Sequence, residues 1–160
     1  MRIIGIDPGL LHTGWGVIEA KNNALRFIAA GTIHPQKNLA LAARLHVLNT
    51  QLAVIVAEHN PTAAAVEETF ANVNGASTLK LGQARGALLL TLAQAGLEPA
   101  EYAANTIKKT LTGRGHGAKA QVEHMVKMLL PTAKGSLTAD SWDALAVAIC
   151  HAQHAGSNLR

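Results

Sequence analysis

Hydrophobic and polar residues alternate at the start of the chain, as in a half-buried β-strand. The alternation covers Arg2–Asp7 and runs into Pro8 and Gly9, a pair typical of a turn. Two more segments of strand-like sequence follow, Gly14–Glu19 and Leu25–Ile33. We therefore expect a three-stranded antiparallel meander at the beginning of the fold.

A single apolar stripe then predicts a helix. Five residues recur at spacings of four and three, which places them on one helix face: Leu41, Leu45, Leu48, Leu52 and Ile55. The next segment, Thr62–Glu67, is a short apolar run that ends in acidic residues. This pattern is typical of a buried strand that ends at a functional site.

The second half of the chain alternates between helical and strand patterns. A loop over Phe70–Gly75 leads into a helix from about Ser77 to Ala95, and Glu98–Ala103 is a further candidate strand. Helices are then expected around Thr106–Leu111, Ala120–Leu130 and Asp140–His154. No repeat or linker divides residues 1–160, so we expect a single domain. Strands first and alternating units later predict an α/β fold, with a mixed five-stranded sheet and helices on both faces.

Four acidic residues fall where such a fold places functional sites. Asp7 and Glu67 each end a predicted strand, and sites in these folds lie beyond the carboxyl ends of strands. Asp140 and Asp143 are three residues apart at the start of the last helix, so they share one helix face. Together the four residues predict an acidic site.

Each acid also has a purely structural interpretation. Asp7 suits the first position of a turn, and Asp140 suits a helix N-cap, with Asp143 favoured by the helix dipole. Glu67 and Glu68 fit a solvated strand end, and strand alternation leaves open which of the two faces the site. The combination of two strand ends and a helix start favours a site.

Clustered carboxylates need positive charge nearby. Two like charges 4 Å apart repel by roughly 4 kcal/mol at an effective dielectric constant near 20. Protonation or divalent cations must relieve this repulsion. Oxygen ligands without thiolates indicate Mg²⁺ or Mn²⁺, and two such ions would support an in-line phosphoryl displacement.

The formal net charge of +4 suggests a polyanionic partner. Six basic residues, against the single acid Glu123, lie between residues 105 and 134: Lys108, Lys109, Arg114, Lys119, Lys127 and Lys134. We interpret this stretch as a phosphate-facing surface, although a solvated basic face explains the charge equally well.

The composition also bears on the cellular compartment. Cys150 is the only cysteine, which excludes an internal disulfide and a cysteine-based zinc site. The start of the sequence lacks a signal-peptide pattern, and no apolar run approaches the ~18 residues of a membrane span. We expect a soluble protein in a reducing cytoplasm, with no membrane partner.

With these residues in view, the sequence resembles the RuvC family of Holliday-junction resolvases, which have a ribonuclease H-like fold. The matching stretches are 5–9 (GIDPG) with Thr13 and Gly14, 66–67 (VE) with Phe70, 79–86 (LKLGQARG), Glu101 with Tyr102, 119–126 in part, and Asp140 with 143–146 (DALA). They span nearly the whole chain, in order and at family-like spacing.

The resemblance implies roles for individual residues. The metal-binding carboxylates of the family fall on Asp7, Glu67, Asp140 and Asp143, which selects Glu67 over Glu68. Lysines that contact DNA near the cut fall on Lys108 and Lys119, and the aromatic residue that engages bases at the junction falls on Phe70. Base stacking of this kind is typically worth about 1–3 kcal/mol. One departure is Trp142, where a small residue is expected between the two aspartates.

The resemblance further implies a structure-selective endonuclease that resolves four-way DNA junctions in recombination and repair. The expected reaction is hydrolysis by metal-activated water, with two Mg²⁺ ions bridged by Asp7 and with Lys119 stabilising charge at the scissile phosphate. Two matched cuts favour a C₂ homodimer. The leucines of 88–92 are a candidate interface, although core burial explains them equally well. A branch-migration helicase complex is an expected partner.

Two other functions also fit parts of the sequence. The Gly-x-Asp-x-Gly opening also occurs in actin- and hexokinase-like phosphotransferases, which need a second phosphate-binding loop that this sequence lacks. The other is a catalytically silent DNA-binding module, against which the four carboxylates argue. Eight histidines are present, and we expect structural or solvated roles for His151 and His154; His116, in a glycine-rich segment, is a candidate for a phosphate contact.

Overall fold

A computed structural model describes the chain except for residue 23 and residues 69–73, 116–117, 134 and 158–160. The described residues form five strands: β1 (Arg2–Asp7), β2 (Thr13–Lys21), β3 (Ala24–Ile33), β4 (Ala63–Glu67) and β5 (Pro99–Tyr102). They also form five helices: α1 (Leu41–His59), α2 (Gly75–Gln94), α3 (Ala104–Thr112), α4 (Lys119–Leu129) and α5 (Ala139–Ser157). Every predicted strand and helix is present, with ends that differ by a few residues.

The strands form one mixed sheet in the order β3-β2-β1-β4-β5. The predicted meander is confirmed, because β1 pairs antiparallel with β2 and β2 pairs antiparallel with β3. The parallel part begins where β1 pairs with β4, with Ile6 opposite Val66, and continues from β4 to β5. The carboxyl ends of β1, β4 and β5 therefore meet at one edge of the sheet.

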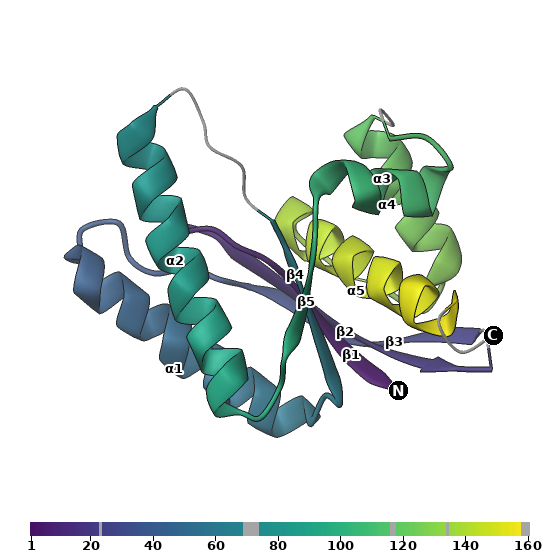
Figure 1. Cartoon of the computed structure of the whole chain (residues 1–160), viewed down its shortest axis with the longest axis horizontal. Helices are drawn as coiled ribbons and strands as arrows, with labels where there is room; N and C mark the ends of the chain where they lie inside the picture. Colours follow the sequence, from purple (N-terminus) through teal and green to yellow (C-terminus); the bar gives the residue numbers. More distant parts are fainter. Residues whose placement is uncertain (23, 69–73, 116–117, 134, 158–160) are drawn as a thin grey trace.

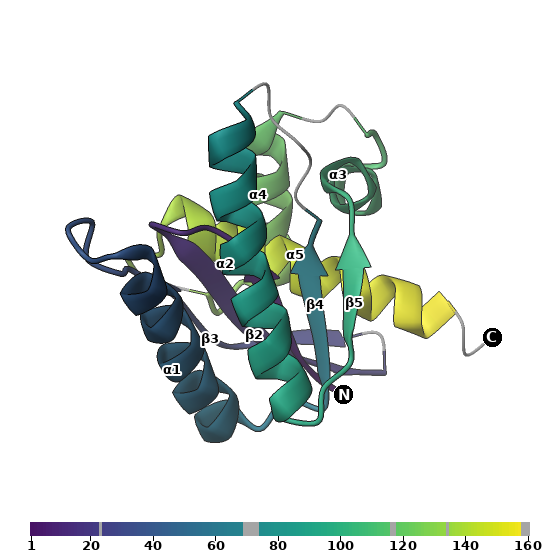
Figure 2. The same ribbon diagram turned by 60° about the vertical axis from the view of Figure 1, so that its left-hand side comes forward.

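Helices lie on both faces of the sheet (Figures 1 and 2). Helices α1 and α2 pack side by side on one face, where Leu48, Leu52, Leu88 and Leu92 are buried against apolar strand residues. Helix α5 crosses the other face, and α3 and α4 pack against it. The apolar stripe predicted for the first helix is fully buried only in its middle, at Leu48 and Leu52, whereas Leu41, Leu45 and Ile55 are partly exposed.

Helix α5 approaches the sheet closely because Gly5 has no side chain. A methyl group added at Gly5, in β1, would overlap the carbonyl oxygen of Ala144 and would lie 2.6 Å from the backbone nitrogen of Ala148. The backbone of α5 thus rests directly on β1. This contact brings the first turn of α5 to the edge of the sheet where β1 ends.

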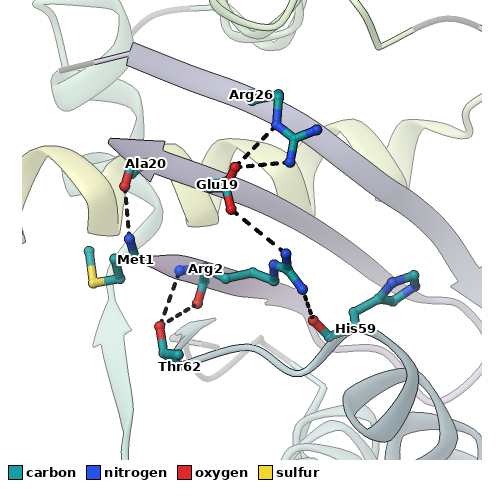
Figure 3. A network of polar contacts seen from close by, with 7 residues as sticks. All are labelled: Met1, Arg2, Glu19, Ala20, Arg26, His59 and Thr62. Carbon is teal, nitrogen blue, oxygen red and sulfur yellow. Dashed lines mark hydrogen bonds and ion pairs between the residues drawn. The ribbon is translucent and has the colours of Figure 1, made fainter. Parts of the chain in front are cut away.

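The opposite end of β1 is held by polar contacts (Figure 3). The amino group of Met1 donates to the carbonyl of Ala20 at 2.9 Å, and the guanidinium of Arg2 donates to the carbonyl of His59 at 2.8 Å. Arg2 also lies 3.7 Å from Glu19, which accepts two hydrogen bonds from Arg26. These contacts tie β1 to β2, to β3 and to the end of α1.

Candidate active site

Strand alternation directs Asp7 and Glu67 toward α5. In β1, Ile3 belongs to the buried cluster on the α5 face, whereas Ile4 and Ile6 belong to the cluster on the opposite face. Asp7 shares the parity of Ile3, and Glu67 shares that of Ala65, which also packs on the α5 face. Because side chains alternate along a strand, both carboxylates lie at the α5 side of the sheet edge.

The register also resolves the choice between Glu67 and Glu68. Glu68 follows the end of β4, and its backbone nitrogen donates to the carbonyl of Tyr102 at 2.8 Å. Its parity is that of Val66, on the α1 and α2 face. Glu67 is therefore the residue of this pair that joins the acidic cluster.

The first turn of α5 is capped by Thr138, and Asp140 is not its N-cap. The hydroxyl of Thr138 accepts from the backbone nitrogen of Ser141 at 3.2 Å, and it lies 2.9 Å from the hydroxyl of Ser141 and 2.5 Å from that of Thr32 in β3. This hydroxyl cluster fixes the helix start to β3. The alternative cap role for Asp140 is thus wrong, and both aspartates of the turn are available to the site.

The four carboxylates act on one another electrostatically. Burial, followed by the charges of Glu67, Asp143 and Asp140 in that order of effect, raises the pKa of Asp7 from 3.8 to about 8. Burial, followed by the charge of Asp143, also raises the pKa of Glu67. The predicted convergence of two strand ends and a helix start is therefore present in the structure.

Lys119 supplies positive charge to the acidic cluster. Its ammonium group lies 2.6 Å from a carboxylate oxygen of Asp143, and this hydrogen bond raises the pKa of Lys119. Lys108, in α3, acts with Lys119 to lower the pKa of Glu67 against the effect of burial. Both lysines predicted to contact DNA thus lie beside the acidic cluster.

A cleft of about 210 Å³ opens beside these residues. Its charged lining consists of Glu67, Asp143, Lys108 and Lys119, and its apolar lining consists of Ala104, Ile107, Val122 and Ala146. The cleft therefore lies between the end of β4 and the three helices α3, α4 and α5. It presents both carboxylates and ammonium groups.

The donor set suits hard divalent cations, since it offers carboxylate oxygens alone. Across the residues that the structure describes, no three Asp, Glu, His or Cys side chains are already gathered into a metal site, and Lys119 instead neutralises Asp143. The partly buried, mutually repelling carboxylates still need further positive charge. On chemistry and burial, the residues fit a metal centre.

Other predicted residues have different positions. Phe70 and His116 lie outside the described residues. Trp142 is buried against α4 and does not line the cleft. His151 lies 2.9 Å from the hydroxyl of Tyr102, in agreement with the structural role expected for it.

Sequence reasoning missed the two groups that position the carboxylates. One is the hydroxyl cluster of Thr32, Thr138 and Ser141. Threonine and serine occur in all kinds of structure, so nothing in the sequence marked these three as partners. The other is the pair Gly5 and Gly14, against which the backbone of α5 packs. The sequence indicated these glycines only as parts of a motif. Glycines that face the same side of two neighbouring strands were the available sign that a helix packs closely on the sheet there.

Comparison with known proteins identifies the family. The model of the family described as Crossover junction endodeoxyribonuclease RuvC matches residues 3–151. This chain belongs to the RuvC family. A curated RuvC from Paramagnetospirillum magneticum is 55% identical over 160 residues, covering 100% of this chain and 96% of that protein. A RuvC from Rhodopseudomonas palustris strain TIE-1 is 52% identical, covering 100% of this chain and 91% of that protein.

A solved structure supports the same assignment. The Thermus thermophilus RuvC in complex with a Holliday junction substrate matches with a TM-score of 0.92 and 30% sequence identity, covering 99% of this chain and 96% of that one. The predicted RuvC membership, the mixed-sheet fold and the divalent-metal-dependent endodeoxyribonuclease function are confirmed. In the part of the chain that the structure describes, no helix has the length and apolar character to span a membrane.

Proposed function

We propose that this protein resolves four-way DNA junctions by paired, symmetric nicks, with Asp7, Glu67, Asp140 and Asp143 holding two Mg²⁺ ions in each active site. The observation that carries the proposal is the electrostatic coupling of Asp7 to the other three carboxylates, which with burial raises the pKa of Asp7 to about 8. Such a cluster is an unfavourable arrangement of like charges unless cations bind to it.

Divalent cations bound there would neutralise the carboxylates, activate a water molecule for attack and stabilise the departing oxygen. The chain itself supplies the placement. Asp7 and Glu67 are fixed by paired strands, and Asp140 and Asp143 by a helix whose start is bonded to β3. Rigid elements of this kind hold ligands with little reorganisation during the reaction. Mn²⁺ would serve the same oxygen ligands.

Lys119 has the position of a residue that stabilises charge on the scissile phosphate. Its side chain is 63% exposed although its ammonium group contacts Asp143, so a phosphate entering the cleft can reach it. Lys108 lines the same cleft and suits a second phosphate contact. Preorganised ammonium groups beside developing negative charge lower the barrier of phosphoryl transfer. Base stacking by Phe70 stays a prediction.

A homodimer would bring two such sites to one junction, at which two of the four strands must be cut as a pair. The leucines of α2 are divided between core and surface. Leu88 and Leu92 are fully buried, whereas Leu90 is 57% exposed and Leu79, three turns away on the same face, is 64% exposed. Of these four leucines, only Leu79 and Leu90 are exposed enough to contact a second subunit. Measuring the molecular mass of the L79E/L90E variant in solution tests whether they hold a dimer together.

A junction-binding helicase complex is an expected partner on the family resemblance alone, and co-purification with a reconstituted branch-migration complex tests it. The cytoplasmic location also stays a prediction. Its support is the single cysteine, Cys150, which is buried and free of disulfide bonding.

The decisive experiment uses a labelled synthetic four-way junction, with linear duplex of the same sequence as control, in Mg²⁺ and in EDTA. Paired nicks at symmetric positions, on the junction alone and only with Mg²⁺, are the expected result. Equal cutting of the duplex would contradict junction selectivity. Binding without cutting in any divalent metal would contradict the proposed chemistry.

A further inference from the structure

Trp142 stands between the two aspartates of α5, but its side chain does not face the cleft. It is 7% exposed and belongs to the same buried cluster as Val122 and Val126 of α4. The cleft is lined by Asp143, the next residue along, and not by Trp142. The indole therefore fills the junction between α5 and α4.

One polar stripe of α4 meets α5 at two adjacent residues. Lys119, Glu123 and Lys127 recur every four residues, so they lie along one side of the helix. At one end of the stripe, Lys119 contacts Asp143 at 2.6 Å. Two turns further on, the ammonium group of Lys127 lies 5.1 Å from the centre of the Trp142 ring, within the range of a cation–π contact.

The middle of the stripe completes this arrangement. Glu123 accepts a hydrogen bond from Lys127 at 2.6 Å, one turn along the helix. This ion pair holds the ammonium group of Lys127 near the indole. The contact between α4 and the start of α5 thus has an aromatic and cationic part at Trp142 and an ionic part at Asp143.

We infer that Trp142 is a positioning residue, which sets α4 against α5 so that the Lys119 ammonium group reaches Asp143 and the scissile phosphate. The inference rests on the function proposed above for Lys119.

The place of Lys119 in its helix explains why it needs this support. Lys119 is the first residue of α4, and the N-cap residue before it is Ala118. The methyl side chain of Ala118 cannot accept a hydrogen bond from the first turn of the helix. The cap is closed instead by Gln121, whose side-chain oxygen accepts from the backbone nitrogen of Ala118. The direction in which Lys119 leaves the helix is therefore fixed by how α4 packs along its length, where Trp142 is the largest side chain that α5 presents.

A double-mutant cycle separates positioning from ordinary packing. The variants are W142L, K119A and W142L/K119A, each compared with wild type in single-turnover nicking of the junction at saturating protein and Mg²⁺. Residues that act through one another are non-additive. We expect W142L to slow nicking roughly tenfold alone and by less than about twofold in the K119A background.

Control variants distinguish the positioning role of Trp142 from a general loss of stability. I149V also removes buried volume from α5 and should have the same small effect in both backgrounds. K127M removes the cation above the ring and should slow nicking about threefold, and E123Q, which removes the ion pair that holds Lys127 near the indole, should slow nicking by no more than K127M does. W142F, which keeps an aromatic ring, should restore most of the rate that W142L loses. Junction affinity, measured separately, should be unchanged by W142L.

The possible failures differ from one another. Equal slowing by W142L in the wild-type and K119A backgrounds would overturn the inference, because Trp142 would then act by packing alone. A wild-type rate in K119A would overturn both this inference and the role of Lys119, while leaving nicking by the carboxylates intact. If W142L does not fold, K127M in the wild-type and K119A backgrounds decides the question in the same way.

Discussion

Gly14 in β2 lies directly against the backbone of Asp140 in α5, and a methyl group added to Gly14 would overlap the carbonyl oxygen of Asp140. Gly14 is also paired with Asp7, across the antiparallel ladder of β1 and β2. One glycine thus contacts the turn that carries Asp140 and Asp143 on one side and the strand end that carries Asp7 on the other. The separation of these carboxylates depends on its missing side chain.

G14A should displace the start of α5 and separate the carboxylates. Overpacking of this kind costs about 1–3 kcal/mol, which corresponds to a fall in Tm of roughly 2–10 °C, and we expect nicking to slow at least about tenfold. Thermal unfolding and junction cleavage measure the two effects. G82A is the matched control, because a methyl group at Gly82 in α2 meets nothing within 4 Å and alanine favours a helix. A G14A protein with wild-type cleavage would show that the close approach is unnecessary.

D7N should remove nicking almost completely while leaving junction binding largely unchanged. The amide retains the shape of the side chain and removes the charge on which cation binding depends, so we expect a loss on the order of 10³-fold or more. Cleavage in Mg²⁺ and a gel-shift assay in EDTA provide the two readouts. E68Q, which alters the neighbouring acid outside the cluster, should cleave normally. Residual cleavage near the wild-type rate in D7N would exclude Asp7 from the reaction.

The same variant should be more stable than wild type when divalent metal is removed with EDTA. The folded state raises the pKa of Asp7 from 3.8 to about 8, so the native protein retains a proton that the unfolded chain releases. Wild-type stability therefore falls as the pH rises between these values. D7N lacks this dependence and should melt at the wild-type temperature below pH 3.8, with an advantage that grows toward pH 8.

For the size of this advantage we expect about 4–8 °C, from roughly 2 kcal/mol of relieved repulsion and desolvation. Thermal melting across the pH range in EDTA measures it, and Mg²⁺ should stabilise wild type more than D7N. An advantage of D7N that is the same at every pH would refute the electrostatic explanation.

T138V should weaken the start of α5 by removing its capping hydroxyl. Loss of an N-cap typically costs about 0.5–2 kcal/mol, or roughly 1–8 °C in Tm for a chain of this size. The hydroxyl also bonds Thr32 and Ser141, so we expect a higher Mg²⁺ concentration for half-maximal cleavage as well. T138S retains the hydroxyl and should behave as wild type in both assays. A T138V protein with unchanged metal dependence would limit the cluster to a role in stability.

The sequence predicted the sheet and the acidic cluster because both depend on short-range patterns. Short strand-like segments predicted where β1 and β4 end, and the spacing of Asp140 and Asp143 predicted that they share one face of α5. The family resemblance selected Glu67, and strand parity in the folded sheet gives the same residue for a physical reason.

The contacts between distant elements could not be predicted in this way. Asp140 and Thr138 are both good N-cap residues, and only the structure shows that Thr138 has this role. The ion pair of Lys119 with Asp143 depends on how α4 packs on α5, which no local pattern encodes. The leucines of α2 were open to two interpretations because burial is decided by the neighbouring α1.

The position of α5 at the end of the element order has a consequence for the synthesis of the enzyme. Asp7 and Glu67 are translated early, but Asp140 and Asp143 belong to the last helix, which must dock on β1 and β2 before the four carboxylates meet. Domains generally fold as units, so the site of this single domain is complete only when α5 is present. A nascent or prematurely terminated chain that contains the sheet but lacks α5 therefore carries Asp7 and Glu67 without Asp140 and Asp143, which is half of the acidic cluster.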